Sequence, residues 1–199
     1  IGSGHTNTVG STCSFIGGGY SNCITGGSSG NAAGGFIGGG SCNLINTTTT
    51  GIANTIVGGQ CNCICSTISP YNYIGGGSGN FINVLSACCG NVIVGGISNT
   101  SSGVFSGILG GLNNNIDLHN SSFIIGTNLT SDANFTTYVN NINISGSITH
   151  NANNVPDGFI ILTHVSQSLN FAYDTAASAG GVPLGGLYRS GNVISIRIE

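Results

Sequence analysis

Side chains able to carry acid, base or nucleophilic chemistry are few and scattered in this chain of 199 residues. Glycoside hydrolysis needs two carboxylates, and no two of the five acids share a short motif. The acids are Asp117, Asp132, Asp157, Asp174 and Glu199. The four histidines stand singly, and Cys88-Cys89 has no flanking base to activate a thiol. The sequence predicts no catalytic residues and no cofactor. A polysaccharide depolymerase remains an alternative, since folding could pair two acids.

Charge is nearly absent from the rest of the chain. Charged residues make up 4% of the sequence, against about 25% in an ordinary soluble domain. The net charge is −3, and Arg189 and Arg197 are the only cations besides histidine. No basic patch can neutralise phosphates, so nucleic acid and anionic membrane surfaces are excluded as partners. No apolar run approaches the ~18 residues of a membrane span, so no membrane insertion is expected.

Cysteine is the other reactive residue type, and the eight cysteines are Cys13, Cys23, Cys42, Cys61, Cys63, Cys65, Cys88 and Cys89. Their spacing lacks the two separated CxxC pairs of a zinc site. We expect them to act mainly as small buried hydrophobic residues, with disulfides between turns or subunits as the alternative. Cys61, Cys63 and Cys65 alternate on a predicted strand and therefore face one way. We expect that way to be inward; pointing outward, they could oxidise or bind soft metals.

An internal repeat organises the first two thirds of the chain. Isoleucine opens seven blocks, at Ile1, Ile16, Ile37, Ile56, Ile74, Ile93 and Ile108. Three positions after each stands a glycine: Gly4, Gly19, Gly40, Gly59, Gly77, Gly96 and Gly111. Six positions after each stands an asparagine: Asn7, Asn22, Asn43, Asn62, Asn80, Asn99 and Asn114. Eight positions on, the residue is aliphatic except at Ser101, and a degenerate eighth block begins at Ile124.

The repeat predicts an all-β fold. Its blocks are too short for helix pairs, and glycine and β-branched residues disfavour helix. We expect each block to be one coil of a β-solenoid, stacked on the next at about 4.8 Å. The repeated glycine would supply positive φ or close backbone approach at a corner, and the asparagines would form a ladder along a turn. In FIGGGSCNLI we expect Gly39 and Gly40 to be required and Gly38 to be replaceable, because other blocks carry valine or leucine there.

Blocks such as IGGGYSNCI, IGGGSCNLI and IGGGSGNFI resemble the head repeats of YadA-type trimeric autotransporter adhesins and of related phage fibres. The resemblance covers residues 1–128. It implies short coils of I-x-G-G-x-x-N type forming a left-handed β-roll, with three rolls packed around an axis in a homotrimer. Residues 129–156 alternate apolar with polar side chains and are predicted to form an extended neck.

Residues 157–199 are predicted to form a small, hairpin-rich β tip domain. We expect a strand at 159–165, a small-residue loop at 175–183 and a hairpin turned by Ser190-Gly191-Asn192. The string GGVPLGGLYRSGNVISIRIE resembles the C-terminal tips of tail-fibre proteins from aquatic bacteriophages. That resemblance implies that the chain ends in the knob of a fibre.

The tip contains the candidate binding residues. Arginine forks suit carboxylates, so Arg189 and Arg197 could pair with acids across subunits or face a ligand. Tyr173 and Tyr188 could stack on sugar rings or form the core of the tip. His164 is ordinarily a packed or surface residue, but three copies around a trimer axis would supply three metal ligands.

These features predict a structural fibre and receptor-binding protein, similar to a phage tail fibre, on a virion or in the extracellular space. The expected partners are two further copies of the chain and a host-surface glycan or protein. A bacterial surface adhesin or self-assembling extracellular filament is the first alternative. An ice-binding solenoid is a second, but only the threonines at 47–50 favour it, and they do not recur in register. Because Ile1 already lies inside the repeat, we expect the chain to be a piece of a longer protein.

Overall fold

A computed structural model describes residues 1–26, 34–47, 53–66, 70–84, 90–142, 171–182, 187–190 and 193–198. The chain divides into two compact units, Ile1–Asn143 and Ile144–Glu199. Among the described residues, no helix is long and apolar enough to cross a membrane.

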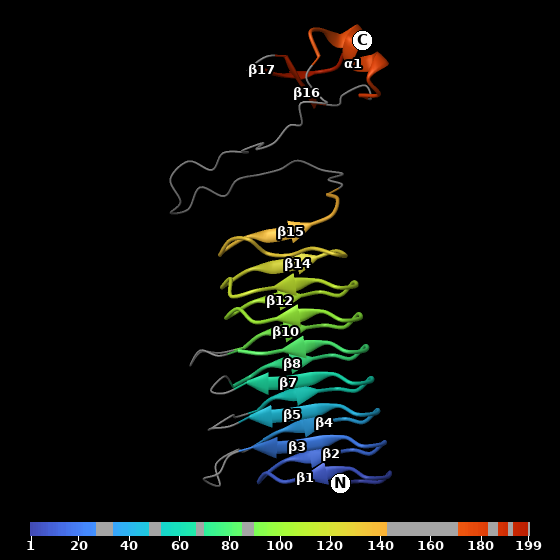
Figure 1. Ribbon diagram of the computed structural model, residues 1–199, viewed down its shortest axis with the longest axis vertical. Coiled ribbons are helices and arrows are strands. Elements are labelled where there is room, and N and C mark those ends of the chain that lie inside the picture. Colours follow the sequence, from blue (N-terminus) through green and yellow to red (C-terminus); the bar gives the residue numbers. More distant parts are fainter. Residues whose placement is uncertain are drawn as a thin grey trace. The chain divides into compact units, whose positions relative to one another are not determined.

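The first unit is a stack of coils in which short strands alternate between two parallel sheets (Figure 1). The seven-stranded sheet contains β1 (Thr8–Val9), β3 (Cys23–Gly26), β5 (Leu44–Thr47), β7 (Cys63–Ser66), β9 (Phe81–Ile82), β11 (Thr100–Ser101) and β13 (Asn115–Ile116). The eight-stranded sheet contains β2 (Phe15–Ile16), β4 (Phe36–Ile37), β6 (Thr55–Ile56), β8 (Tyr73–Ile74), β10 (Val92–Ile93), β12 (Gly107–Ile108), β14 (Phe123–Ile125) and β15 (Thr137–Val139). The predicted all-β solenoid is confirmed.

The core is a column of isoleucines between the two sheets. The isoleucine that opens a coil pairs in register with the next one, as Ile37 does with Ile56, and both are fully buried. The second sheet contributes the aliphatic residue eight positions on, such as Ile64, which is also fully buried. Because side chains on a strand alternate between faces, the residues on either side of each isoleucine point outward.

The solenoid continues past residue 128, where the sequence predicts it to end. β14 pairs with β15, and Ile124 is in register with Tyr138. Tyr138 packs against the isoleucine core and replaces the isoleucine of a further coil. This coil keeps the fold without the repeated glycine and asparagine. The repeat is therefore not visible in the sequence there. Residues 129–139 of the predicted neck are therefore part of the sheet structure.

Besides the repeated glycine, the coils turn through one left-handed residue at each of two corners. At the corner after the repeated glycine they include Ser21, Cys42, Cys61 and Ser98, with φ from 51° to 57°. At the opposite corner they include Cys13, Ala53, Tyr71 and Phe105, with φ from 53° to 63°. Left-handed backbone costs most residues about 1–2 kcal/mol, so regular stacking of the coils must offset this strain.

The second unit contains the helix α1 (Asp174–Ala179) and the strands β16 (Leu187–Ser190) and β17 (Val193–Ile196). β16 and β17 pair antiparallel, with Ser190 opposite Val193, as the predicted hairpin requires. The small-residue loop predicted at 175–183 is wrong over its first half. Alanines at 176, 177 and 179 favour helix, and Ala177 is buried against Val182 and Phe171. The predicted strand at 159–165 lies outside the described residues.

Candidate functional site on the solenoid surface

The repeated glycines lie at one corner of seven coils, with φ between 87° and 101°. A Cβ atom on Gly40 would lie 2.1 Å from the carbonyl oxygen of Gly59 in the next coil and 2.8 Å from Asn43 Nδ2. Real Cβ atoms essentially never approach backbone so closely, and a positive φ of this size is unfavourable for any other residue. The site therefore requires glycine both for its backbone conformation and for the space it leaves.

The expectation for the two neighbouring glycines is reversed. A Cβ atom on Gly38 would lie 2.3 Å from the carbonyl oxygen of Val57, whereas one on Gly39 would have no neighbour closer than 3.8 Å. Aligning blocks suggests that Gly38 is replaceable because other coils carry larger residues at that position. Whether a side chain fits there depends on how closely the carbonyl oxygen of the next coil approaches. The sequences of the blocks do not contain that distance.

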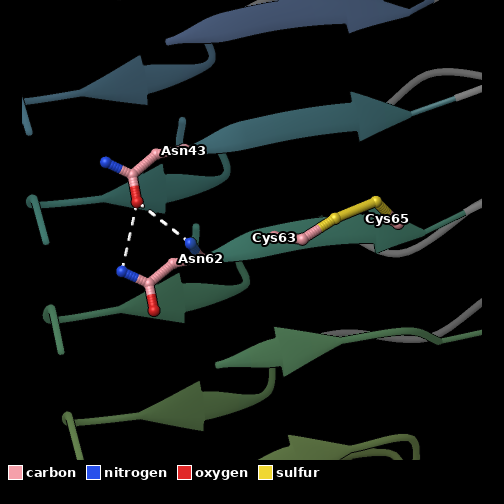
Figure 2. Close-up of a disulfide and its surroundings, with 4 residues drawn as sticks. All are labelled: Asn43, Asn62, Cys63 and Cys65. Atoms are coloured by element: carbon pink, nitrogen blue, oxygen red, sulfur yellow. Dashed lines mark hydrogen bonds between the residues drawn. A yellow bond between two sulfur atoms is a disulfide. The ribbon is translucent and has the colours of Figure 1, made fainter. Parts of the chain in front are cut away.

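The repeated asparagines form a continuous hydrogen-bonded ladder beside these glycines. Asn62 is fully buried, and Figure 2 shows how its backbone and side-chain nitrogens both donate to Asn43 Oδ1, at 3.1 Å each. Asn62 Nδ2 also donates to the carbonyl oxygens of Gly58 and Gly77, at 3.0 Å each. Asn62 Oδ1 accepts in turn from both nitrogens of Asn80. Each asparagine thus joins its own corner to the coils on both sides.

The ladder ends at Leu129, which occupies the position of an asparagine. Its backbone nitrogen donates to Asn114 Oδ1 at 3.1 Å, but its side chain has no polar atom with which to continue the chain of bonds. At this corner, the side chain of Asn140 bonds to the backbone of Thr127, where the backbone of a further coil would otherwise pair. Its Oδ1 accepts from Thr127 N at 2.6 Å, and its Nδ2 donates to Thr127 O at 3.1 Å.

A second ladder at the opposite corner was not predicted. Asn72 donates from its backbone and side-chain nitrogens to Asn54 Oδ1, at 2.9 and 3.1 Å. Asn91 N donates to Asn72 Oδ1, and Ser106 N to Asn91 Oδ1. The signal was an asparagine two positions before the isoleucine in three consecutive blocks. Asn54 Nδ2 is buried without a hydrogen-bond partner, because the same position in the preceding coil is Gly35.

Ser101 is the one polar residue in the aliphatic position of the seven blocks, and its hydroxyl is buried without a hydrogen-bond partner. We expect Ser101→Ala to raise the free energy of unfolding by about 1 kcal/mol, because an unsatisfied buried polar group costs roughly 1–3 kcal/mol. Chemical denaturation followed by circular dichroism measures this change.

Ser106→Ala is the matched control for Ser101→Ala. Ser106 is also buried, but its hydroxyl lies 3.1 Å from Val104 O and accepts from Ser122 N at 3.2 Å. The same substitution should therefore lower the free energy of unfolding here. Equal effects of the two substitutions would contradict the assignment of Ser101 as an unsatisfied group.

The predicted inward direction of Cys61, Cys63 and Cys65 is wrong. Cys61 is an exposed turn residue, and Cys63 and Cys65 lie on the outer face of β7, joined by a disulfide (Figure 2). Ile64 and Ser66 fill the inward positions of the strand. Cys13 and Cys42 are exposed and Cys23 is half-buried, all as free thiols. The described cysteines are therefore surface residues, while Cys88 and Cys89 lie outside the described residues.

The two outer faces of the solenoid differ in chemistry. No strand of either sheet contains a charged residue, so the difference lies in the apolar side chains of the eight-stranded sheet. Its outer face carries a group of exposed apolar side chains on and beside β10, β12 and β14, which we call the apolar patch: Val92, Val94, Leu109, Phe123 and Ile125, each between 37% and 52% exposed. The Phe123 ring lies over Gly107, where a Cβ atom would be 2.8 Å from the ring.

The seven-stranded sheet presents a mixed outer row instead. The row consists of half-buried residues: Cys23, Leu44, Cys63, Phe81, Thr100 and Asn115, beginning with the exposed Thr8. Threonines do not follow one another in this row, and Thr47 points inward and is buried. Thr48–Thr50 lie outside the described residues. The described faces thus offer one apolar surface and no threonine ladder.

Tyr173 and Arg197 are the predicted tip residues whose side chains the structure describes. Arg197 Nη1 donates to Val182 O at 2.6 Å, a contact within its own unit. Asp174 Oδ2 accepts from Ile198 N at 2.8 Å. Tyr173 is 63% exposed and does not form a core. The side chains of Tyr188 and Arg189 lie outside the described residues, as do Asp157, His164 and Glu199.

Two of the three described acids, Asp132 and Asp174, accept hydrogen bonds within their own units. Asp132 Oδ1 accepts from the Tyr138 hydroxyl at 2.7 Å, and this hydroxyl accepts from Asp132 N and Ala133 N at 2.8 Å. Among the residues that the structure describes, no three histidine, cysteine or acidic side chains gather as metal ligands. The chain matches no protein-family model, no curated protein and no solved structure.

Proposed function

We propose that this protein is a non-enzymatic, homotrimeric fibre segment that attaches a virion to a host surface, similar to a phage tail fibre. The observation that carries the proposal is the exposed apolar patch on the outer face of the eight-stranded sheet. The number of copies and the link to phage fibres rest on the resemblance of the repeats and of the C-terminal string.

A second copy of the same chain is the occupant that best fits the apolar patch. Contiguous exposed apolar surface is unfavourable in water and usually marks an interface. The patch lacks charge, so a partner recognised by opposite charge gains nothing there. Copies arranged around a closed symmetry axis turn the same face toward that axis, so each copy brings the same neutral, apolar chemistry to it. Leu109 is the most exposed member of the patch at 52%, so the largest exposed fraction of a side chain would be buried there.

Attachment is assigned to the second unit. The exposed Tyr173 ring offers an apolar face and a hydroxyl, a combination that suits sugars and is enriched at interfaces. The Arg197 contact with Val182 supports a structural role for that arginine, so Tyr173 is the described candidate for ligand contact. Three copies would present three such sites together, and linked weak sites bind far more tightly than one.

The rival function is a bacterial surface adhesin or an extracellular filament built by end-to-end stacking of solenoids. Electron microscopy separates the two, since the proposal predicts discrete fibres on virions and the rival predicts open-ended filaments of one chain.

Retention on bacterial cells and on arrays of bacterial surface polysaccharides tests the proposal. We expect Leu109→Asp to place a charge in the interface, separate the copies and weaken retention by about 100-fold through lost avidity. Ser102→Asp, beside β11 on the opposite sheet, adds the same charge and should leave retention unchanged. Equal retention of both variants would contradict the interface, and no retention of the wild-type chain would contradict attachment.

A further inference from the structure

Two thiols occupy the same turn position in consecutive coils. Cys42 and Cys61 directly follow the bridged residues Ser41 and Gln60. Both have left-handed backbone, with φ of 57° and 53°, and both are exposed free thiols. Because equivalent residues of coils stacked in register have the same orientation, the two side chains leave the same corner in the same direction.

The spacing of the coils suits a disulfide between these residues. Cys61 N donates to Ser41 O at 2.9 Å, and Ser41 N donates to Gly59 O at 2.9 Å, which fixes the register. Stacked strands lie about 4.8 Å apart, which is within the roughly 4.4–6.8 Å between the Cα atoms of a disulfide and slightly above the roughly 3.5–4.5 Å between its Cβ atoms. A bond between Cys42 and Cys61 therefore requires rotation of the side chains and a small approach of the two turns.

Among the equivalent turn positions of neighbouring coils, Cys42 and Cys61 each have only the other as a thiol partner. The same turn position is Ser21 in the coil before Cys42 and Gly79 in the coil after Cys61. Neither offers a thiol, and Gly79 adds no side chain to crowd the pair. Cys63 lies on the adjoining strand but is already bonded to Cys65. The disulfide on β7 thus lies next in sequence to a corner with one reduced pair.

We propose that Cys42 and Cys61 form a disulfide that links adjacent coils, by exchange with a small-molecule disulfide such as oxidised glutathione. The Cys61 thiolate attacks one sulfur of the glutathione disulfide, and the first glutathione leaves as a thiolate. The Cys42 thiolate then attacks the Cys61 sulfur of the mixed disulfide, and the second glutathione leaves. Two cysteine thiols are oxidised, one glutathione disulfide is reduced, and the two protons pass to the leaving thiolates.

The bond would link two coils that otherwise hold together through hydrogen bonds and packing. Cross-linking residues 42 and 61 restrains the unfolded chain, so the folded stack should resist heat better once the bond has formed. The proposal concerns one chain alone and stands whether or not the protein is trimeric or binds a host.

The test treats the intact chain with oxidised glutathione under native conditions, stops exchange with acid and maps disulfides by pepsin digestion and mass spectrometry. We expect a peptide pair joined through Cys42 and Cys61, and a higher midpoint of thermal unfolding. Cys61→Ser should leave Cys42 as a glutathione adduct and abolish the thermal shift. Cys13→Ser, which removes an equally exposed turn thiol at the opposite corner, should change neither result.

Two outcomes would overturn the proposal. One is separate glutathione adducts on Cys42 and Cys61 after prolonged treatment, which would show that the thiols do not reach each other. The other is a link from either residue to Cys63 or Cys65, which would show that exchange with the existing disulfide is favoured over the bond between coils.

Discussion

Gly59→Ala should lower the free energy of unfolding by about 3–5 kcal/mol, an exceptional loss for one methyl group. The added Cβ atom would lie 2.2 Å from the carbonyl oxygen of Gly77 in the next coil and 2.7 Å from Asn62 Nδ2. The φ of 91° at Gly59 adds strain for any residue with a side chain. Because the closest atom, Gly77 O, belongs to the backbone, the clash can be removed only by separating the two coils.

Circular dichroism during urea unfolding measures this loss. A solenoid is stabilised by contacts between neighbouring repeats, so a defect between the coils of Gly59 and Gly77 should also broaden the transition. Gly58→Ala is the matched control, because a Cβ atom there would have no neighbour closer than 3.9 Å. If both variants unfold at the wild-type urea concentration, the close approach of coils at this corner is incorrect.

Asn62→Ala should cost about 3–4 kcal/mol of unfolding free energy. The substitution removes the acceptor of both Asn80 nitrogens and the donor to Gly58 O and Gly77 O. Asn62 is fully buried, so water cannot replace these bonds, and each unsatisfied group costs roughly 1–3 kcal/mol before the structure relaxes.

Asn115→Ala provides the comparison for the asparagine ladder. Asn115 lies on the outer face of β13 and is half-buried, so its amide remains in reach of water. We expect a change below about 0.5 kcal/mol, as for most surface substitutions. Urea midpoints of the two variants should differ widely, and an Asn62→Ala protein as stable as Asn115→Ala would mean that the ladder contributes little.

The period of the repeat made the solenoid predictable from the sequence. Seven isoleucines in register with seven glycines and seven asparagines define one strand and one corner of each coil. The opposite corner could not be predicted because its left-handed positions hold residues such as Cys13, Ala53 and Tyr71, which are not typical turn residues. The apolar patch escaped because it arises only when residues from separate coils are stacked on one face.

The direction of Cys63 and Cys65 could have been predicted. Ile64 lies eight positions after Ile56, the place of the buried aliphatic residue in the repeat. Since neighbouring residues on a strand face opposite ways, an inward Ile64 places both cysteines outside. The repeat is therefore a better guide to side-chain direction than the general preference of cysteine for burial.

The mass of the intact chain in native buffer, measured by light scattering after size-exclusion chromatography, tests the central claim most directly. The single chain has a mass of 19.8 kDa. A homotrimer joined through the outer face of the eight-stranded sheet predicts three times that mass, independent of dilution across the working range of concentration. A mass of 19.8 kDa for the folded protein would contradict the trimeric fibre and leave the apolar patch without its proposed partner.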